Sequence, residues 1–195
     1  METLTLIEKG RDIVARRVRP KELIEALPLE AFDYACAMTR SKPWFQKGNW
    51  TIRHGLYEDN FPDQTGVFLI LSKPHWKESL GEKQGIHVGI WVDSTGSYKG
   101  FLNTCMHVFK MPNSEVGKIH QREIGRPFLE KHGAEIASWP HYRVSKMAKT
   151  LFIAKLPLPE TKAEIEGLIL QQIERMDRFG NTIDEILARL YLTRE

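Results

Sequence analysis

The sequence predicts an α+β fold, in which a central, mainly antiparallel sheet is flanked by N-terminal helices and a long C-terminal helical segment. Apolar residues recur at helical spacing towards both ends of the chain, whereas the middle contains short alternating or continuously apolar runs. No linker rich in Gly, Ser or Pro divides the 195 residues. We therefore expect a single domain over 1–195, with a helical part over 1–40, a mixed sheet and helix core over 50–157 and C-terminal helices over 160–194.

The N-terminal part contains several helical signals. Apolar residues at helical spacing predict a first helix over 3–18, ending before Pro20. Residues 21–26 fit a short helical turn, and Pro28 suits the first position of another helix that ends near Thr39. That helix is expected to turn three residues inward, namely Phe32, Ala35 and Cys36.

The following segment predicts strands. Alternation over 50–57 is typical of an edge strand, and the continuously apolar run GVFLIL over 66–71 is typical of a strand buried on both faces. The segment 86–92 alternates cleanly, with one side formed by Ile86, Val88, Ile90 and Val92. Apolar residues occupy both odd and even positions over 98–110, so both faces of a strand there would be apolar. This pattern predicts a strand paired with 86–92 in a hairpin, with a helix as the alternative.

The remainder of the core mixes helix and strand signals. A helix is expected over 119–132, where Pro127 can occupy only a first turn or a kink and Gly133 is a suitable cap. Short strands are then expected over 134–139, 142–144 and 150–156.

The C-terminal segment predicts the longest helix. Thr161 and Glu164 have the spacing of a capping box, and an apolar stripe follows until Gly180, where a break is expected. The stripe resumes over 183–190. We expect this segment to cover the sheet; the alternative is an arm through which a homodimer forms.

Charge and cysteine content restrict the class of protein. The formal net charge of +3 tolerates a polyanionic partner but is far from a histone-like composition. Cys36 and Cys105 lack the spacing of a disulfide framework or zinc site, which favours a reducing cytoplasm. Because neither a secretory leader nor a run of about 18 apolar residues is recognisable, we expect a cytoplasmic protein without a membrane partner.

No local motif identifies an enzyme. The patterns GxxxxGK[ST], GxGxxG, GxSxG, HxH and HExxH do not occur, so we expect no cofactor and no metal. His87 and His107 would face each other across the expected hairpin, and Cys105 would share a strand face with His107. Such histidines are more often hydrogen-bonded or solvated than catalytic, and such a cysteine is more often a small buried side chain.

Cations lie beside aromatic residues in two segments, and this composition suits contact with phosphates and bases. The first is RSKPWFQKGNWTIRH over 40–54, and the second lies over 142–149. The residues expected to contact nucleic acid are Arg40, Lys42, Trp44, Lys47, Trp50, Arg53, Tyr142, Arg143, Lys146 and Lys149. The same composition arises when a loop packs its rings into the core and leaves its lysines in water.

The order of elements from about Lys83 onward resembles an uncharacterised domain often attached to restriction-endonuclease-like bacterial proteins. The resemblance lies in the apolar and aromatic patterns of IHVGIWVD, FLNTCMHVF, RPFLEKHGAEIASW, AKTLFIAKLPL and IERMDRFGNTIDEIL. It implies an association with nucleic acid processing or phage defence, and it supplies no catalytic residues.

Three hypotheses follow for function. The first is a non-catalytic accessory domain that binds DNA, RNA or a protein associated with them. The second is a small metal-dependent nuclease or other hydrolase that uses His87 and His107 or acids among Glu58, Asp59, Asp63, Glu78 and Glu82. Lys73 could supply the lysine of a D/E-x-K pattern, but the acid of that pattern is missing. The third is a protein-binding inhibitor or immunity-type factor with an exposed apolar patch over 183–190.

Overall fold

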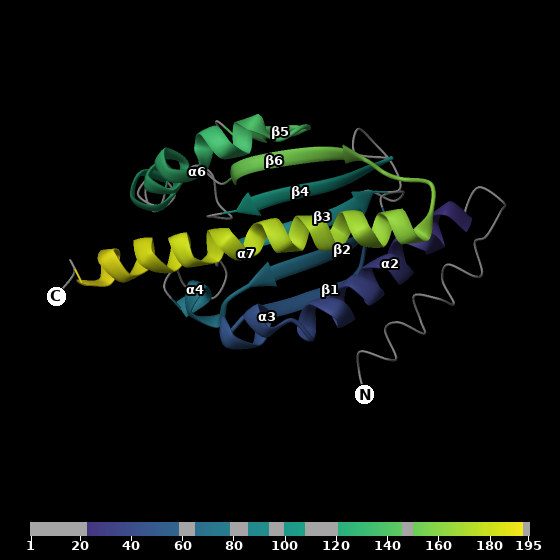
Figure 1. Ribbon diagram of the computed structural model, residues 1–195, viewed down its shortest axis with the longest axis horizontal. Helices are drawn as coiled ribbons and strands as arrows, with labels where there is room; N and C mark the ends of the chain where they lie inside the picture. Colours follow the sequence, from purple (N-terminus) through teal and green to yellow (C-terminus); the bar gives the residue numbers. More distant parts are fainter. Residues whose placement is uncertain are drawn as a thin grey trace.

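The computed structural model describes residues 23–58, 65–78, 86–93, 100–107, 121–145 and 150–192. Along the chain, its elements are α2 (Leu23–Arg40), α3 (Pro43–Lys47), β1 (Thr51–Glu58), β2 (Thr65–Ser72), α4 (Pro74–Glu78), β3 (His87–Asp93), β4 (Phe101–His107), the π-helical turn η2 (Gln121–Gly125), α6 (Arg126–Ser138), β5 (Tyr142–Val144), β6 (Thr150–Pro157) and α7 (Lys162–Leu192) (Figure 1). The strands form a six-stranded sheet in the order β1-β2-β3-β4-β6-β5, and every neighbouring pair is antiparallel. The predicted α+β class is confirmed.

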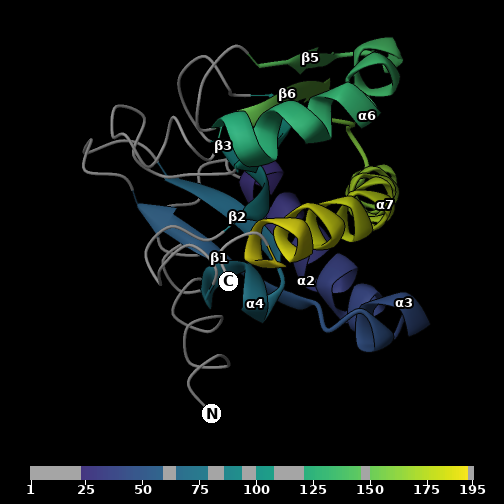
Figure 2. The ribbon, with the colours of Figure 1, turned by 90° about the vertical axis from the view of Figure 1, so that its left-hand side faces the viewer.

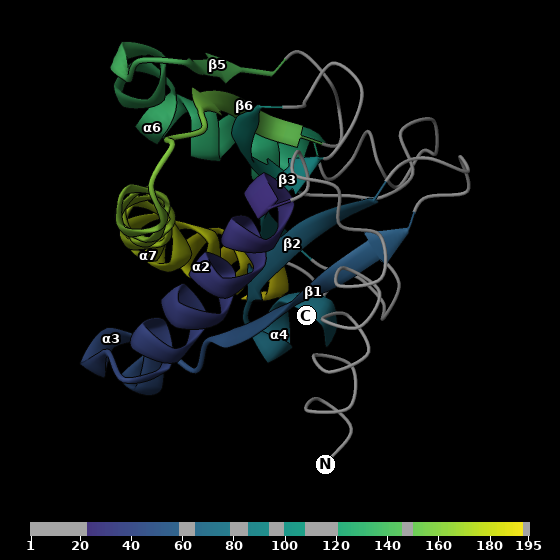
Figure 3. The same ribbon diagram turned by 90° about the vertical axis from the view of Figure 1, so that its right-hand side faces the viewer.

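The helices lie on one side of the sheet. Helix α7 runs along the middle of that side, with α2 and α6 next to it (Figures 1 and 2). We call this side the helix face. The opposite side is called the open face, because no helix in the described part of the chain crosses it (Figure 3).

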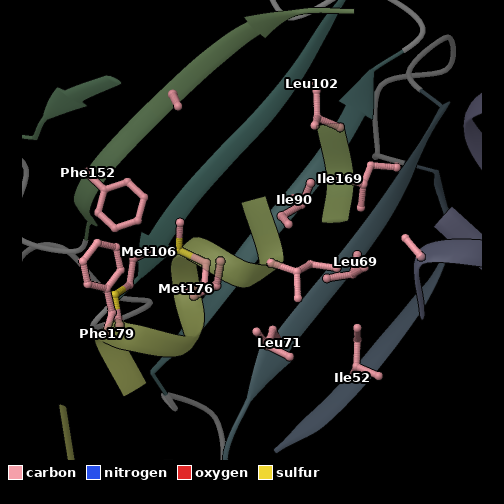
Figure 4. Packing of buried hydrophobic residues seen from close by; sticks show 14 of the residues in the cluster. Ile52, Leu69, Leu71, Ile90, Leu102, Met106, Phe152, Ile169, Met176 and Phe179 are labelled. Atoms are coloured by element: carbon pink, nitrogen blue, oxygen red, sulfur yellow. The ribbon is translucent and has the colours of Figure 1, made fainter. Parts of the chain in front are cut away.

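The core fills the space between the sheet and α7. Strand residues such as Leu69, Ile90 and Met106 are fully buried and point towards α7, which contributes Ile169 and Met176 (Figure 4). Alternation of side chains along each strand places every second residue in this layer. The four side chains predicted on one side of 86–92, those of Ile86, Val88, Ile90 and Val92, are all buried there.

The strand β2 departs from its prediction on one point. Val67, Leu69 and Leu71 are buried on the helix face, but Phe68 and Ile70 are only half-buried. The expectation of burial on both faces is therefore wrong, because the described helices cover only one of them. The run GVFLIL therefore includes two apolar side chains, Phe68 and Ile70, that remain partly exposed to solvent.

Helix α2 is longer than expected. It is continuous from Leu23 to Arg40 and contains Pro28, which therefore does not start a helix. A proline within a helix removes one backbone hydrogen bond. The burial of apolar residues that follow Pro28 in the helix offsets this loss of stability. Phe32, Ala35 and Cys36 are fully buried, as predicted. The helix expected over 3–18 lies outside the described residues.

Helix α6 replaces an expected strand. It continues through Gly133 to Ser138, so the strand over 134–139 and the cap at Gly133 are both wrong. Phe128, His132 and Ile136 are spaced by four residues, and the rings of Phe128 and His132 contact Phe179 of α7. This packing stabilises a helix where the local sequence alone indicates a stop.

Helix α7 is also continuous. The capping box at its start is present, because the Thr161 hydroxyl donates to Glu164 Oε2 at 2.6 Å and the Thr161 backbone N–H lies 3.3 Å from the same oxygen. Gly180 does not break the helix; a Cβ at this position would overlap the Trp50 ring, so the glycine allows close packing. Ile183 and Leu187 are buried against the rest of the chain, and α7 covers the sheet as expected.

Candidate functional site

The open face carries a row of six residues that crosses the whole sheet. Registers between neighbouring strands align Arg53, Ile70, Gly89, Cys105, Ile153 and Arg143 in that order. The two arginines are exposed and stand on the two edge strands, β1 and β5. With neighbouring strands about 4.8 Å apart, the ends of the row are separated by about 24 Å.

A second row lies beside the first. It aligns Phe68, Trp91, Asn103 and Lys155 on β2, β3, β4 and β6. The Trp91 indole N–H donates to Asp93 Oδ2 at 3.0 Å, which fixes the orientation of the ring. Burial raises the pKa of this carboxyl group. The open face thus combines aromatic rings and cations on adjacent strands.

A shallow hollow of about 390 Å³ lies over β1 to β4 on this face. Its lining includes Arg53, Phe68, Ile70, Trp91 and Cys105. Gly89 lies between them, and a Cβ at that position would lie 3.5 Å from the Cys105 Sγ. The missing side chain therefore leaves room above the thiol.

The floor of the hollow contains a thiol and two imidazoles. The Cys105 Sγ lies 2.9 Å from His107 Nε2, and the Thr150 Oγ1 lies 3.2 Å from His107 Nδ1. The ring centroids of His87 and His107 are 5.0 Å apart, with an interplanar angle of 44°. The predicted contact between the two histidines is confirmed, as is the shared strand face of Cys105 and His107.

A separate polar cluster connects β2 and α4 to α7 on the helix face. The Lys73 side chain is only 4% exposed, and its ammonium donates to Asp184 Oδ2 at 2.5 Å. Oδ1 of the same carboxylate lies 2.8 Å from His75 Nε2 and accepts the Trp76 indole N–H at 2.7 Å. The ammonium also lies 4.8 Å from the Trp50 ring centroid. Lys73 thus has a structural partner on α7.

Two carboxyl groups near Lys73 have opposite pKa shifts. Burial opposes ionisation of Asp184, but the hydrogen bonds from Lys73, Trp76 and His75 outweigh it and lower its pKa. Burial raises the pKa of Asp177, and the charge of Lys73 only partly offsets this. Asp184 is therefore the carboxylate that compensates the buried ammonium.

The residues of the segment 40–54 lie partly in the core and partly on two different surfaces. Trp50 is buried, and edge-to-face contacts connect it to Trp44 on one side and Trp76 on the other. Trp44 and Phe45 are half-buried and pack against the core. These rings therefore do not share one exposed surface with the cations of the segment.

The cations of 40–54 have different surroundings. Lys42 forms an ion pair with Glu174 at 3.1 Å, and the Arg40 guanidinium donates to the Ile52 carbonyl at 3.4 Å. Lys47 is exposed on α3. Among the cations predicted in this segment, Arg53 contributes to the open face.

The second predicted segment is divided in the same way. The Tyr142 ring is buried, its hydroxyl donates to Gln172 Oε1, and burial raises its pKa. Arg143, the next residue, lies on the open face. Lys146 and Lys149 lie outside the described residues.

The acids named in the hydrolase hypothesis are not among the side chains that the structure describes. Asp59, Asp63 and Glu82, and the side chains of Glu58 and Glu78, fall outside the described part of the chain. Within that part, no group of three His, Cys, Asp or Glu side chains is arranged to hold a metal ion. None of the helices described is long and apolar enough to cross a membrane.

Sequence reasoning missed several open-face residues, notably Phe68, Trp91, Lys155 and Thr150. The alternation of 86–92 places Trp91 opposite the core, which is the one local signal for any of these four residues. The alignment with β6 depends on pairing between strands far apart in the chain, which no local pattern specifies. Comparison of the chain with protein-family models, curated proteins and solved structures gives no match.

Proposed function

We propose that this chain is a non-catalytic accessory domain that binds single-stranded nucleic acid on the open face of its sheet. The observation that carries the proposal is the row of six residues, which begins at Arg53 and ends at Arg143. Both side chains are exposed, and both belong to the residues that the sequence predicts for this role.

The two arginines suit phosphate groups. Guanidinium groups donate charge-assisted hydrogen bonds to phosphate oxygens in a bidentate geometry. A separation of about 24 Å across the strands allows the two residues to contact different phosphates of one extended strand. Lys155, one row away from Arg143, adds a third cation on the same face.

The rings between the cations suit bases. Phe68 and Trp91 are directly opposite each other on β2 and β3, and Trp91 is oriented by Asp93. Unpaired bases stack on such rings whatever their sequence, whereas the bases of a duplex are already stacked. This favours a single strand over a duplex.

The proposed contact residues differ in part from those predicted from the sequence. Arg53 and Arg143 remain, whereas the buried rings of Trp50 and Tyr142 give way to Phe68 and Trp91. A role in nucleic acid processing or phage defence rests on the family resemblance in the second half of the chain. The ligand class rests on the open face.

Fluorescence anisotropy with a labelled single-stranded oligonucleotide tests the proposal. The double variant Arg53→Gln/Arg143→Gln should bind about tenfold more weakly than the wild type, because two exposed ionic contacts together contribute about 1.4 kcal/mol. A duplex of the same sequence should bind more weakly than the single strand.

The matched control is Arg122→Gln/Arg126→Gln, which removes the same charge from η2 and the start of α6. Its affinity should stay close to that of the wild type. Equal losses in the two double variants would mean that net charge, not the open face, determines binding, and would contradict the proposal.

A further inference from the structure

The two cysteines of the chain lie in different chemical surroundings. Cys36 is fully buried in α2, and burial raises the pKa of its thiol to about 12. Cys105 lies at the floor of the hollow on the open face, with an imidazole nitrogen 2.9 Å from its sulfur. The two thiols are therefore expected to react very differently.

Each ring nitrogen of His107 lies within hydrogen-bond distance of a polar side chain. With a proton on Nδ1 that is donated to the Thr150 hydroxyl, the Nε2 lone pair faces the Cys105 thiol. A nucleophile next to a base, with the base oriented by a third group, is the arrangement that activates thiols and hydroxyls in proteins. The β4–β6 pairing creates it, since Thr150 pairs with His107.

The hollow limits which reagents reach the thiol. Cys105 is only 1% exposed, so a bulky electrophile cannot approach it, whereas Gly89 leaves room for a slender one. Arg53 lines the same hollow and favours an anionic group there.

We propose that Cys105 is a nucleophilic modification site, activated by His107, that takes small carboxylate-bearing disulfides. In the reaction, the thiol proton moves to His107 Nε2 while Sγ bonds to one sulfur of the reagent. The S–S bond of the reagent breaks, and the departing thiolate takes the proton from Nε2. The products are a mixed disulfide on Cys105 and one free thiol. This inference does not depend on nucleic acid binding.

Mass spectrometry of the full chain tests the proposal. The native protein is treated with dithiodiglycolate, and modification of the Cys36 and Cys105 peptides is followed over time. Cys105 should react faster than Cys36 by on the order of a hundredfold, the range that a positioned base supplies. The urea-unfolded chain provides the intrinsic rate of each cysteine. Equal native rates, or faster modification of Cys36, would overturn the proposal without any variant.

Two further arms test the assigned roles. His107→Gln should slow modification of Cys105 while the rate at Cys36 stays the same, which also reports that the fold is intact. Neutral 2-hydroxyethyl disulfide, normalised to its rate with the unfolded chain, should react more slowly than dithiodiglycolate, and Arg53→Gln should remove this difference. An unchanged Cys105 rate in His107→Gln would refute activation by the imidazole, and equal normalised rates of the two reagents would refute the anionic preference.

Discussion

Gly180 illustrates how single residues determine the packing of this fold. It lies in the middle of α7, is buried, and faces the Trp50 ring and the Lys73 side chain. A glycine within a helix costs about 1 kcal/mol relative to alanine. Here that cost is offset, because no other residue allows the helix to approach the indole so closely.

Gly180→Ala should therefore destabilise the protein, although alanine is the better helix former. The added methyl group overlaps the Trp50 ring, and overpacking of a core costs about 1–3 kcal/mol. The control is Gly167→Ala in the same helix, where the added Cβ meets no atom within 4 Å. That change should stabilise the protein by about 0.5–1 kcal/mol. Urea unfolding measures both, and a stabilised Gly180→Ala variant would contradict the packing described.

The connection between β2, α4 and α7 depends on one buried ion pair. Lys73 follows β2 directly, and its ammonium is compensated by Asp184 of α7. Loss of one partner leaves the other charge buried and is usually strongly destabilising. The pair therefore keeps the C-terminal half of α7 in place on the sheet.

Asp184→Asn should reduce the free energy of unfolding at pH 7 by about 2–3 kcal/mol, less than for a fully buried pair because the Asp184 side chain is 32% exposed. The pKa of Asp184 is lowered in the folded state, so its contribution is present above the unfolded pKa of about 3.9 and lost as pH falls further. The difference between wild type and variant should thus shrink in urea unfolding below about pH 4.

Asp177→Asn provides the control for this pH dependence. Burial raises the pKa of Asp177, so ionisation of this group disfavours the folded state as pH rises through the folded pKa. The stability of the wild type relative to Asp177→Asn should therefore increase as pH falls, the opposite of the trend for Asp184. A pH-independent Asp184→Asn difference would contradict the assigned role of the carboxylate.

Helices and strands are predicted best from the sequence where the spacing of apolar residues is regular over a short segment. The segment 86–92 alternates strictly, and the structure confirms both the strand and its buried side. The prediction is wrong where tertiary packing keeps a Gly or Pro within a helix, as at Pro28, Gly133 and Gly180. Buried apolar residues follow Pro28, and buried apolar residues lie on both sides of Gly133 and of Gly180. Local propensity is too weak to outweigh such burial.

The whole molecule explains why the candidate site was only partly predictable. All described helices that pack on the sheet cover its helix face, so the opposite side chains form the open face (Figure 2). The strand order β4-β6-β5 places Ile153 and Arg143 in register with Arg53, although the segments are far apart in the sequence. A composition of cations and rings identified the two arginines. It did not distinguish them from neighbours such as Trp50 and Tyr142, which the core buries.

The salt dependence of oligonucleotide binding tests the central claim most directly. Each neutralised phosphate of a single strand contributes about 0.7 to the slope of log affinity against log salt concentration. The slope of Arg53→Gln/Arg143→Gln should therefore be shallower than that of the wild type by about 1.4, while Arg122→Gln/Arg126→Gln keeps the wild-type slope. Equal slopes for wild type and Arg53→Gln/Arg143→Gln would mean that the open-face arginines do not contact phosphates, and would contradict the account.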